Sequence, residues 1–358
     1  MGDFGRTGYC LLISSLLLTV FGIIMVYSSS WIYSDYYHGN SYYLLLRQLV
    51  AFAIGLGAMW LFIRVNLTRL LDYSGYLMAL FVFFTLVSLV PGLSTGGRWI
   101  DLGPLSFQPT EGLKFGLILW ASLAITDLGG RLKDFRQGVA PFILVVGFIS
   151  LLTLLQPDFS MTVVLISVVG FLLFVGGARL ADLGKVILLG VPLLGGLLVL
   201  EPYRLERLIS FFGTGGDQLG TGYQMTQSLI AFGSGGVAGK GLGGSVGKFL
   251  YLPAGHNDFI YAIVGEELGF IGALLVIGLF VALGVSGFKI ALDAESEVFG
   301  LIAAGITFVI CFQALLNFSV TLGLLPVTGL TLPFISYGGS SLIVSLAMVG
   351  TLLNIATQ

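Results

Sequence analysis

The sequence contains few charged residues, histidines and cysteines, the residue types that cover soluble proteins or bind metals. Only 9% of its 358 residues are charged, and it holds two histidines and two cysteines. Two histidines exclude a His-rich metal cluster, and Cys10 and Cys311 stand inside apolar runs without metal-ligand spacing, which assigns both to packing. The formal net charge of −2 leaves no basic face to neutralise a run of phosphates, so a nucleic-acid partner is excluded.

Apolar side chains are present in excess. Hydrophobic residues make up 56% of the chain, and the mean hydropathy of +1.01 is too high for a soluble globule. Apolar windows repeatedly reach about 20 residues, the length of a helix that crosses a bilayer, and lack the alternation of a membrane barrel. The first window has no cleavage site after it, which predicts a retained span. We therefore expect an all-α polytopic membrane protein.

The apolar windows predict about ten transmembrane helices in a single membrane domain, residues 1–358. They cover residues 8–28, 45–64, 70–90, 110–127, 138–156, 159–177, 183–200, 258–287, 297–322 and 331–354. Lys and Arg in short loops resist translocation, so the side with more of them is cytoplasmic. A cytoplasmic N-terminus leaves only Arg47 and Arg98 in the short outer segments and places both termini in the cytoplasm.

One connection, residues 201–257 between spans 7 and 8, is much longer than the others. It is rich in glycine and interleaves tyrosines with basic residues, which is more apolar anchoring than a flexible linker carries. We expect a folded extracytoplasmic cap. We find no internal repeat, and the charged and Gly/Pro-interrupted segments do not pair between the halves, which disfavours an inverted-repeat transporter.

The stretch "YLPAGHNDFIYAIVGEELGFIGALLVIGLF", residues 251–280, carries three carboxylates into an apolar run. Ionisable groups within a span are costly, so each is a functional candidate. Asp258 stands where the outer loop enters the span, which suits a general base, but Asn257 or Asp258 is equally suited to cap the helix. On a continuous helix Glu266 leans toward the side of Asp258, about 80° away. We interpret Glu266 and Glu267 as hydrogen-bonded pins between helices.

Other ionisable residues stand at or near span ends. Glu111 and Lys114 are three residues apart on one helix face and can form an ion pair inside the membrane. Asp158 lies between two spans joined by almost no loop, where capping the following helix and facing a cavity are both open. The interpretation as structural groups leads for all three residues.

Two glycine-rich segments interrupt the helical pattern. "LLPVTGLTLPFISYGGSSL", residues 324–342, predicts broken backbone that lines a cavity, because irregular backbone at membrane depth needs protein or water around it. "GSGGVAGKG" does not follow a strand, so its likeness to a phosphate-binding loop is weak.

Five long motifs occur together in this chain. They are "GGRWIDLGPLSFQPTEGLK" (96–114), "LQPDFSMT" (155–162), "GYQMTQSLIAFGSGGVAGKGLG" (222–243), "LPAGHNDFIYAIVGEELGFIG" (252–272) and "LLPVTGLTLPFISYGGSS" (324–341). In this order they resemble the signatures of the SEDS family (shape, elongation, division and sporulation), which includes FtsW and RodA. The resemblance covers nearly the whole chain and is closer to the division-type FtsW than to the elongation-type RodA.

The resemblance implies a peptidoglycan glycosyltransferase that polymerises lipid II outside the bacterial cytoplasmic membrane. It implies a class B penicillin-binding transpeptidase as partner, with other divisome or elongasome membrane proteins. Asp258 matches the family's essential aspartate. The family's polar positions match Glu111, Lys114, Asp158, Ser336 and Tyr337.

Basic residues are candidates for holding the diphosphate of the donor, with a divalent cation, Mg or Mn, as a further candidate. They are Arg98, Arg204, Arg207, Lys240 and Lys248. Contact with anionic lipid headgroups is the alternative role for each. The chain departs from the common "LPEAHTDF" pattern, with Ala254, Gly255 and Asn257 before Asp258, so we expect a single-base mechanism. A lipid II flippase and a non-catalytic division scaffold are the alternatives from other functional classes.

Overall fold

The computed structural model describes residues 4–101, 103, 106–200, 211 and 220–358; Arg204 and Arg207 lie outside this part of the chain. Long helices dominate it. They are α1 (Gly5–His38), α2 (Tyr43–Arg64), α3 (Leu67–Asp72), α4 (Ser74–Val87), α5 (Pro109–Leu128), α6 (Ala140–Leu155), α7 (Phe159–Val175), α8 (Leu180–Leu200), α10 (Thr221–Ser234), α11 (Ile260–Asp293), α12 (Glu297–Thr321) and α13 (Gly339–Ile355). Short strands β1 (Ile100–Asp101) and β2 (Ser106–Phe107) pair antiparallel. Short turns of helix are η1 (Gly129–Lys133), η2 (Phe135–Val139) and η3 (Gly247–Tyr251).

The chain is an all-helical polytopic membrane protein, as its composition predicts. By length and composition, six of the described helices are suited to cross a membrane: α1, α2, α5 with η1, η2 with α6, α11 and α12. Helices also occupy the other predicted ranges, but the number of crossings stays a prediction. Several predicted ranges differ from the helix bounds. Residues 70–90 hold α3 and α4, which meet at Tyr73, and the last helix begins at Gly339 instead of residue 331 because the backbone before it is irregular.

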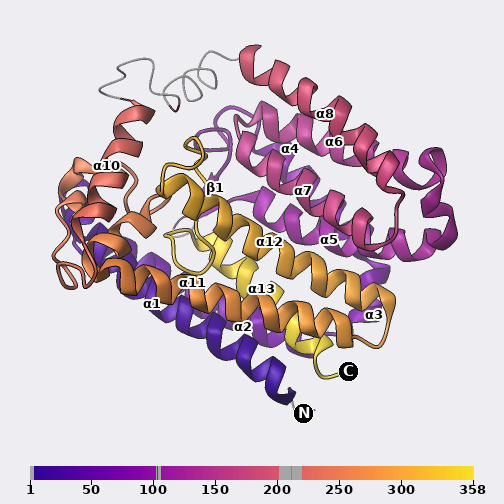
Figure 1. Ribbon diagram of the computed structural model, residues 1–358, viewed down its shortest axis with the longest axis horizontal. Helices are drawn as coiled ribbons and strands as arrows, with labels where there is room; N and C mark the ends of the chain where they lie inside the picture. The colour runs from indigo at the N-terminus through magenta and orange to yellow at the C-terminus, as the bar shows by residue number, and fades with distance from the viewer. Residues whose placement is uncertain (1–3, 102, 104–105, 201–210, 212–219) are drawn as a thin grey trace.

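Helix α12 lies in the middle of the bundle (Figure 1). It contacts α11 on one side and α5 and α7 on the other, while α1 packs on α11 and α2 packs on α13. The two ends of the chain lie at the same end of the bundle (Figure 1), where Gly8 of α1 approaches Leu353 and Ala356. The cytoplasmic placement of both termini stays a prediction.

Helix α11 is broken at Gly269, whose φ of 67° and ψ of −166° are not helical. A break leaves backbone groups on both sides without partners in the helix. The loop 235–241 supplies them. Lys240 N–H and Gly241 N–H donate to the carbonyls of Glu266 and Glu267, and Gly236 and Val237 accept from the N–H groups of residues 270 and 271.

The glycines of this loop allow the close approach. A Cβ at Gly235 would collide with the carbonyl oxygen of Gly265, and one at Gly239 with that of Glu267. The motif that weakly resembles a phosphate-binding loop is therefore a backbone dock for α11. The described part of the predicted cap, residues 220–257, is folded against the bundle.

Candidate active site around Asp258

Asp258 lies in the turn that precedes α11, outside the helix. The residue at the N-cap position is Phe259, whose side chain makes no capping hydrogen bond. Neither Asn257 nor Asp258 occupies this N-cap position, so a capping role for either residue stays a prediction. The predicted 80° relation between Asp258 and Glu266 is wrong, because Asp258 precedes the helix that carries Glu266. Asp258 is half-buried, so its carboxylate lies at a boundary between protein and surroundings.

The turn that carries Asp258 is held through its main chain. Asn317 of α12 donates one amide N–H to the carbonyl of Asp258 and the other to that of Leu330, both at 2.8 Å. The hydroxyl of Ser336 donates to the carbonyl of Asn257 at 2.6 Å, and Tyr337 N–H donates to that of His256 at 3.0 Å. Two of the predicted site residues, Ser336 and Tyr337, thus position the turn.

The irregular segment 322–338 connects this turn to the rest of the bundle. The Asp258 carboxylate lies 3.7 Å from the position that a Cβ on Gly329 would occupy. Next to it, Ser160 of α7 donates to the carbonyl of Thr328 at 2.5 Å, and Gln313 of α12 donates to that of Thr331 at 3.1 Å. Polar side chains from two helices thus satisfy the broken backbone, and protein covers the segment there. The predicted cavity along this segment stays a prediction.

Glu111 and Lys114 form the predicted ion pair, at 2.8 Å, near the start of α5. Both side chains are 3% exposed. Lys114 also donates to Gln313 Oε1 at 2.8 Å, and Gln313 holds the carbonyl of Thr331. The pair therefore reaches the 322–338 segment through one amide, so its direct contact with substrate stays a prediction.

Asp158 caps α7, as the structural interpretation predicted. Its carboxylate accepts from Met161 N–H at 3.1 Å and from Gln108 at 3.4 Å. Arg98 donates to the carbonyl of Gln156 at 2.8 Å and also to that of Pro157. Arg98 and Asp158 therefore meet at one turn, which is joined through Ser160 to the segment beside Asp258.

Glu266 and Glu267 are ion-paired with the folded loop. Glu266 contacts Lys240 at 2.6 Å and accepts from the hydroxyl of Ser245 at 2.5 Å. Glu267 contacts Lys248 at 3.3 Å and accepts from Ser28 of α1. We define these four charged residues as the clasp.

The clasp changes the roles expected for its two lysines. Lys248 is buried, with a side chain 1% exposed, and Lys240 is 33% exposed. The structure thus disfavours the predicted role of Lys248 as a diphosphate ligand at an open surface. The interpretation of the two glutamates as hydrogen-bonded pins fits these contacts.

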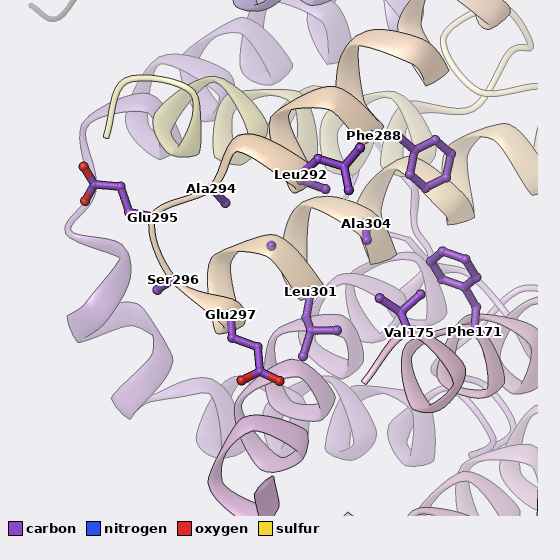
Figure 2. A pocket seen from close by; sticks show the side chains of 12 residues that line it. Phe171, Val175, Phe288, Leu292, Ala294, Glu295, Ser296, Glu297, Leu301 and Ala304 are labelled. Carbon is purple, nitrogen blue, oxygen red and sulfur yellow. The ribbon is translucent and has the colours of Figure 1, made fainter. Parts of the chain in front are cut away.

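A cavity of about 400 Å³ lies at the opposite end of α11 and contains no predicted site residue. Apolar side chains from α7, α11 and α12 surround it, including Phe171, Val175 and Phe288 (Figure 2). Among the residues that the structure describes, no group of three or more His, Cys, Asp or Glu side chains could hold a metal ion.

The sequence analysis missed the buried amides of this site. Gln313 and Asn317 are each 1% exposed, and Gln48 of α2 donates to the carbonyl of Ser336 and accepts from Gly338 N–H. The available signal was two amides four residues apart on one face of an apolar helix. Such spacing marks polar contacts inside a membrane bundle.

Comparison with known proteins gives matches along the whole chain. Residues 9–358 match the FtsW/RodA/SpoVE family, described as cell cycle proteins. The chain is 40% identical to stage V sporulation protein E of Bacillus subtilis (strain 168), over 97% of this chain and 96% of the relative. It is 40% identical to a probable peptidoglycan glycosyltransferase FtsW of Coxiella burnetii (strain RSA 493 / Nine Mile phase I), over 97% and 95%.

Two solved structures share the fold. A chain of a peptidoglycan synthase complex is 28% identical, with a TM-score of 0.78 over 99% of this chain and 97% of that chain. The rod shape determining protein RodA of Thermus thermophilus is 28% identical, with a TM-score of 0.71 over 99% and 96%.

Proposed function

Because the chain belongs to the FtsW/RodA/SpoVE family of cell cycle proteins, we propose that it is a peptidoglycan glycosyltransferase that polymerises lipid II. The observation that carries the proposal is similarity over nearly the full length to relatives named as probable peptidoglycan glycosyltransferases. The placement of Asp258 adds support, since a carboxylate on a clamped turn at a half-buried position suits proton transfer.

In the proposed reaction, the 4-hydroxyl of the acceptor sugar attacks the anomeric carbon of the growing strand. The new glycosidic bond forms as the bond to undecaprenyl diphosphate breaks, with inversion, and Asp258 accepts the hydroxyl proton. A positioned base contributes about 10²- to 10⁴-fold to the rate, so orientation and charge stabilisation supply the rest. The Asn317, Ser336 and Tyr337 contacts fix the main chain of the base and so serve orientation.

The departing diphosphate needs positive charge. Arg98 is the strongest described candidate, because it lies at the Asp158 turn, whereas Lys240 and Lys248 already pair with glutamates. Arg204 and Arg207 keep their predicted role. A requirement for Mg or Mn is proposed as well, with chelation by EDTA and readdition of each metal as its test.

We place the reaction at the outer face of the cytoplasmic membrane, with a class B penicillin-binding transpeptidase as partner. The similarity to a chain of a peptidoglycan synthase complex supports a partner. Relatives named FtsW favour septal synthesis over elongation, whereas the equally similar sporulation protein points to a sporulation septum. Imaging a tagged protein at the division septum, the sporulation septum or the side wall separates these roles.

The test is polymerisation of labelled lipid II by the purified protein with its class B partner. Glycan strands that depend on this chain are expected. Transport of lipid II into vesicles without polymer would replace the proposal with the flippase. If the protein neither polymerises nor transports lipid II but still recruits its partner normally, the non-catalytic scaffold is the remaining function.

A further inference from the structure

A second cavity lies directly beside the Asp258 turn. Its volume is about 260 Å³, just below the roughly 300 to 1,000 Å³ of typical small-ligand sites, so it has room for one sugar-sized group. One wall is the end of α1 and the other is the chain from η3 to His256, two residues before Asp258. The lining includes Ser29, Tyr33, Tyr37, Lys248, Ala254 and His256.

Aromatic rings form the α1 wall of this cavity. The Tyr33 ring lies 4.5 Å from that of Tyr37 and 4.7 Å from that of His256. His256 in turn lies 6.1 Å from Tyr337, the residue that clamps the turn. Such rings offer electron-rich faces to C–H groups and polar edges or hydroxyls to hydrogen-bonding groups.

The charges around the cavity are balanced. Lys248 is the one cation among the described lining residues, and it donates to the carbonyl of Gly243 and pairs with Glu267. Burial lowers the pKa of His256 to about 4, so the imidazole is neutral near pH 7. A diphosphate would find no available positive charge there, so the lining suits an uncharged polar ligand.

The opposite wall holds unusual backbone. Leu250 and Ala254 line the cavity with positive φ angles of 65° and 55°. Residues other than glycine rarely adopt this conformation, which is strained where the surroundings impose it. Such strain concentrates at ligand sites.

We propose that this cavity is a carbohydrate subsite that binds one N-acetylated hexosamine ring of the glycan substrate. This proposal rests on the proposed function. The sugar's C–H face stacks on Tyr33 or Tyr37, and its acetamide methyl contacts the apolar wall at Leu252 and Ala254. Binding here holds a sugar next to the turn that carries Asp258.

The competing explanation for the tyrosines is an aromatic belt at the membrane interface. Tyr42, 54% exposed and stacked on Tyr27 at 5.5 Å, does not line the cavity and serves as the matched control. A belt predicts equal effects of replacing Tyr42 and Tyr37, whereas a subsite predicts an effect of Tyr37 only.

The first experiment measures binding of a soluble N-acetylglucosamine tetramer to the full chain in detergent, by protein fluorescence, and does not depend on polymerisation. Saturable binding is expected for wild type and Tyr42→Ala, with about 3- to 10-fold weaker binding for Tyr33→Ala and Tyr37→Ala. Tyr37 is 58% exposed, so its replacement leaves the fold intact even if Tyr33→Ala does not fold. No binding to wild type, or equal binding to all variants, would overturn the subsite.

The second experiment identifies the source of the sugar in the lipid II polymerisation assay. A KM for lipid II raised by a similar factor at unchanged kcat in Tyr37→Ala assigns the subsite to lipid II. Shorter strands at unchanged KM assign it to the growing strand. If wild type binds the tetramer but makes no polymer, the proposed function fails while the carbohydrate site stands.

Discussion

Two sets of carboxylates, eight residues apart, lie in different surroundings. Glu266 and Glu267 are at most 1% exposed. Each forms an ion pair with a lysine and accepts hydrogen bonds from serine hydroxyls and main-chain N–H groups. Asp258 lies in a turn outside the helix, is half-buried, and has its main chain held by Asn317. The clasp joins a loop to α11. The hydrogen bond from Asn317, by contrast, holds the main chain of Asp258, from which the candidate catalytic carboxylate projects.

This difference explains why carboxylates occur in so apolar a stretch. The break at Gly269 separates them from residues 270–288, which carry no charged side chain. The sequence pattern predicted one span that contains all three acids. In the structure, the two glutamates lie in the part of α11 before Gly269, which binds the loop 235–241. Buried acids here stabilise architecture, and the acid at the boundary is the candidate for chemistry.

Replacing Asp258 by Asn has the largest expected effect. Loss of the base should lower the polymerisation rate by about 10²- to 10⁴-fold without changing the thermal midpoint in detergent. Glu111→Gln and Asp158→Asn are the comparison variants in the same assay. Full activity in Asp258→Asn would move the proton acceptor to another residue, and a matching loss in Glu111→Gln would remove the distinction between the two acids.

Removing one partner of the clasp should affect stability instead. Glu267→Ala leaves the buried Lys248 ammonium without its carboxylate, which costs about 3 to 5 kcal/mol in the free energy of unfolding. The double variant with Lys248→Met should recover much of that loss, because no buried charge then remains.

The control for the clasp is an exposed ion pair. Lys185 is 63% exposed in its ion pair with Asp182. Lys185→Ala should therefore lower the free energy of unfolding by less than about 1 kcal/mol. Thermal or denaturant unfolding in detergent measures all three variants. A neutral Glu267→Ala variant with reduced kcat would contradict the structural role of the clasp.

Disrupting the close contact between the loop 235–241 and α11 should have the next smaller effect on stability. Gly235→Ala forces a methyl group against the carbonyl of Gly265, and such overpacking costs about 1 to 3 kcal/mol. Gly233, two residues earlier on α10, has open space at its Cβ position, so Gly233→Ala should be neutral or slightly stabilising. Equal unfolding midpoints for the two variants would show that the loop does not depend on this close approach.

The sequence was sufficient for the features that local chemistry determines. Apolar length predicted the helices, the spacing of Glu111 and Lys114 predicted their ion pair, and the glycines and prolines of 324–342 predicted broken backbone. Each of these depends on neighbours in the chain. The family resemblance, carried by long motifs, predicted the matches that the comparisons found.

The missed features depend on contacts between distant segments. Nothing local shows that Gly269 breaks α11, since isolated glycines are common in membrane helices; the break is stabilised by backbone groups of residues 236–241. Likewise, Lys248 was assigned to diphosphate because its partner Glu267 is 19 residues away. The clamp by Asn317 joins residues 59 apart, and no periodicity within one helix indicates it.

The smallest expected effect concerns pH and separates the Asp258 turn from the clasp. Burial lowers the pKa of His256 from 6.5 to about 4, so the folded state binds fewer protons than the unfolded state between these values. Stability from this residue is therefore complete above about pH 6.5 and falls as the pH decreases toward 4. The loss amounts to about 1 kcal/mol between about pH 7 and about pH 5.5.

Unfolding midpoints across this range should fall more steeply for wild type than for His256→Gln, in which this proton uptake is absent. Parallel curves for the two proteins would assign the acid sensitivity to other groups, with the clasp glutamates first among them, and the turn would then contribute none of it.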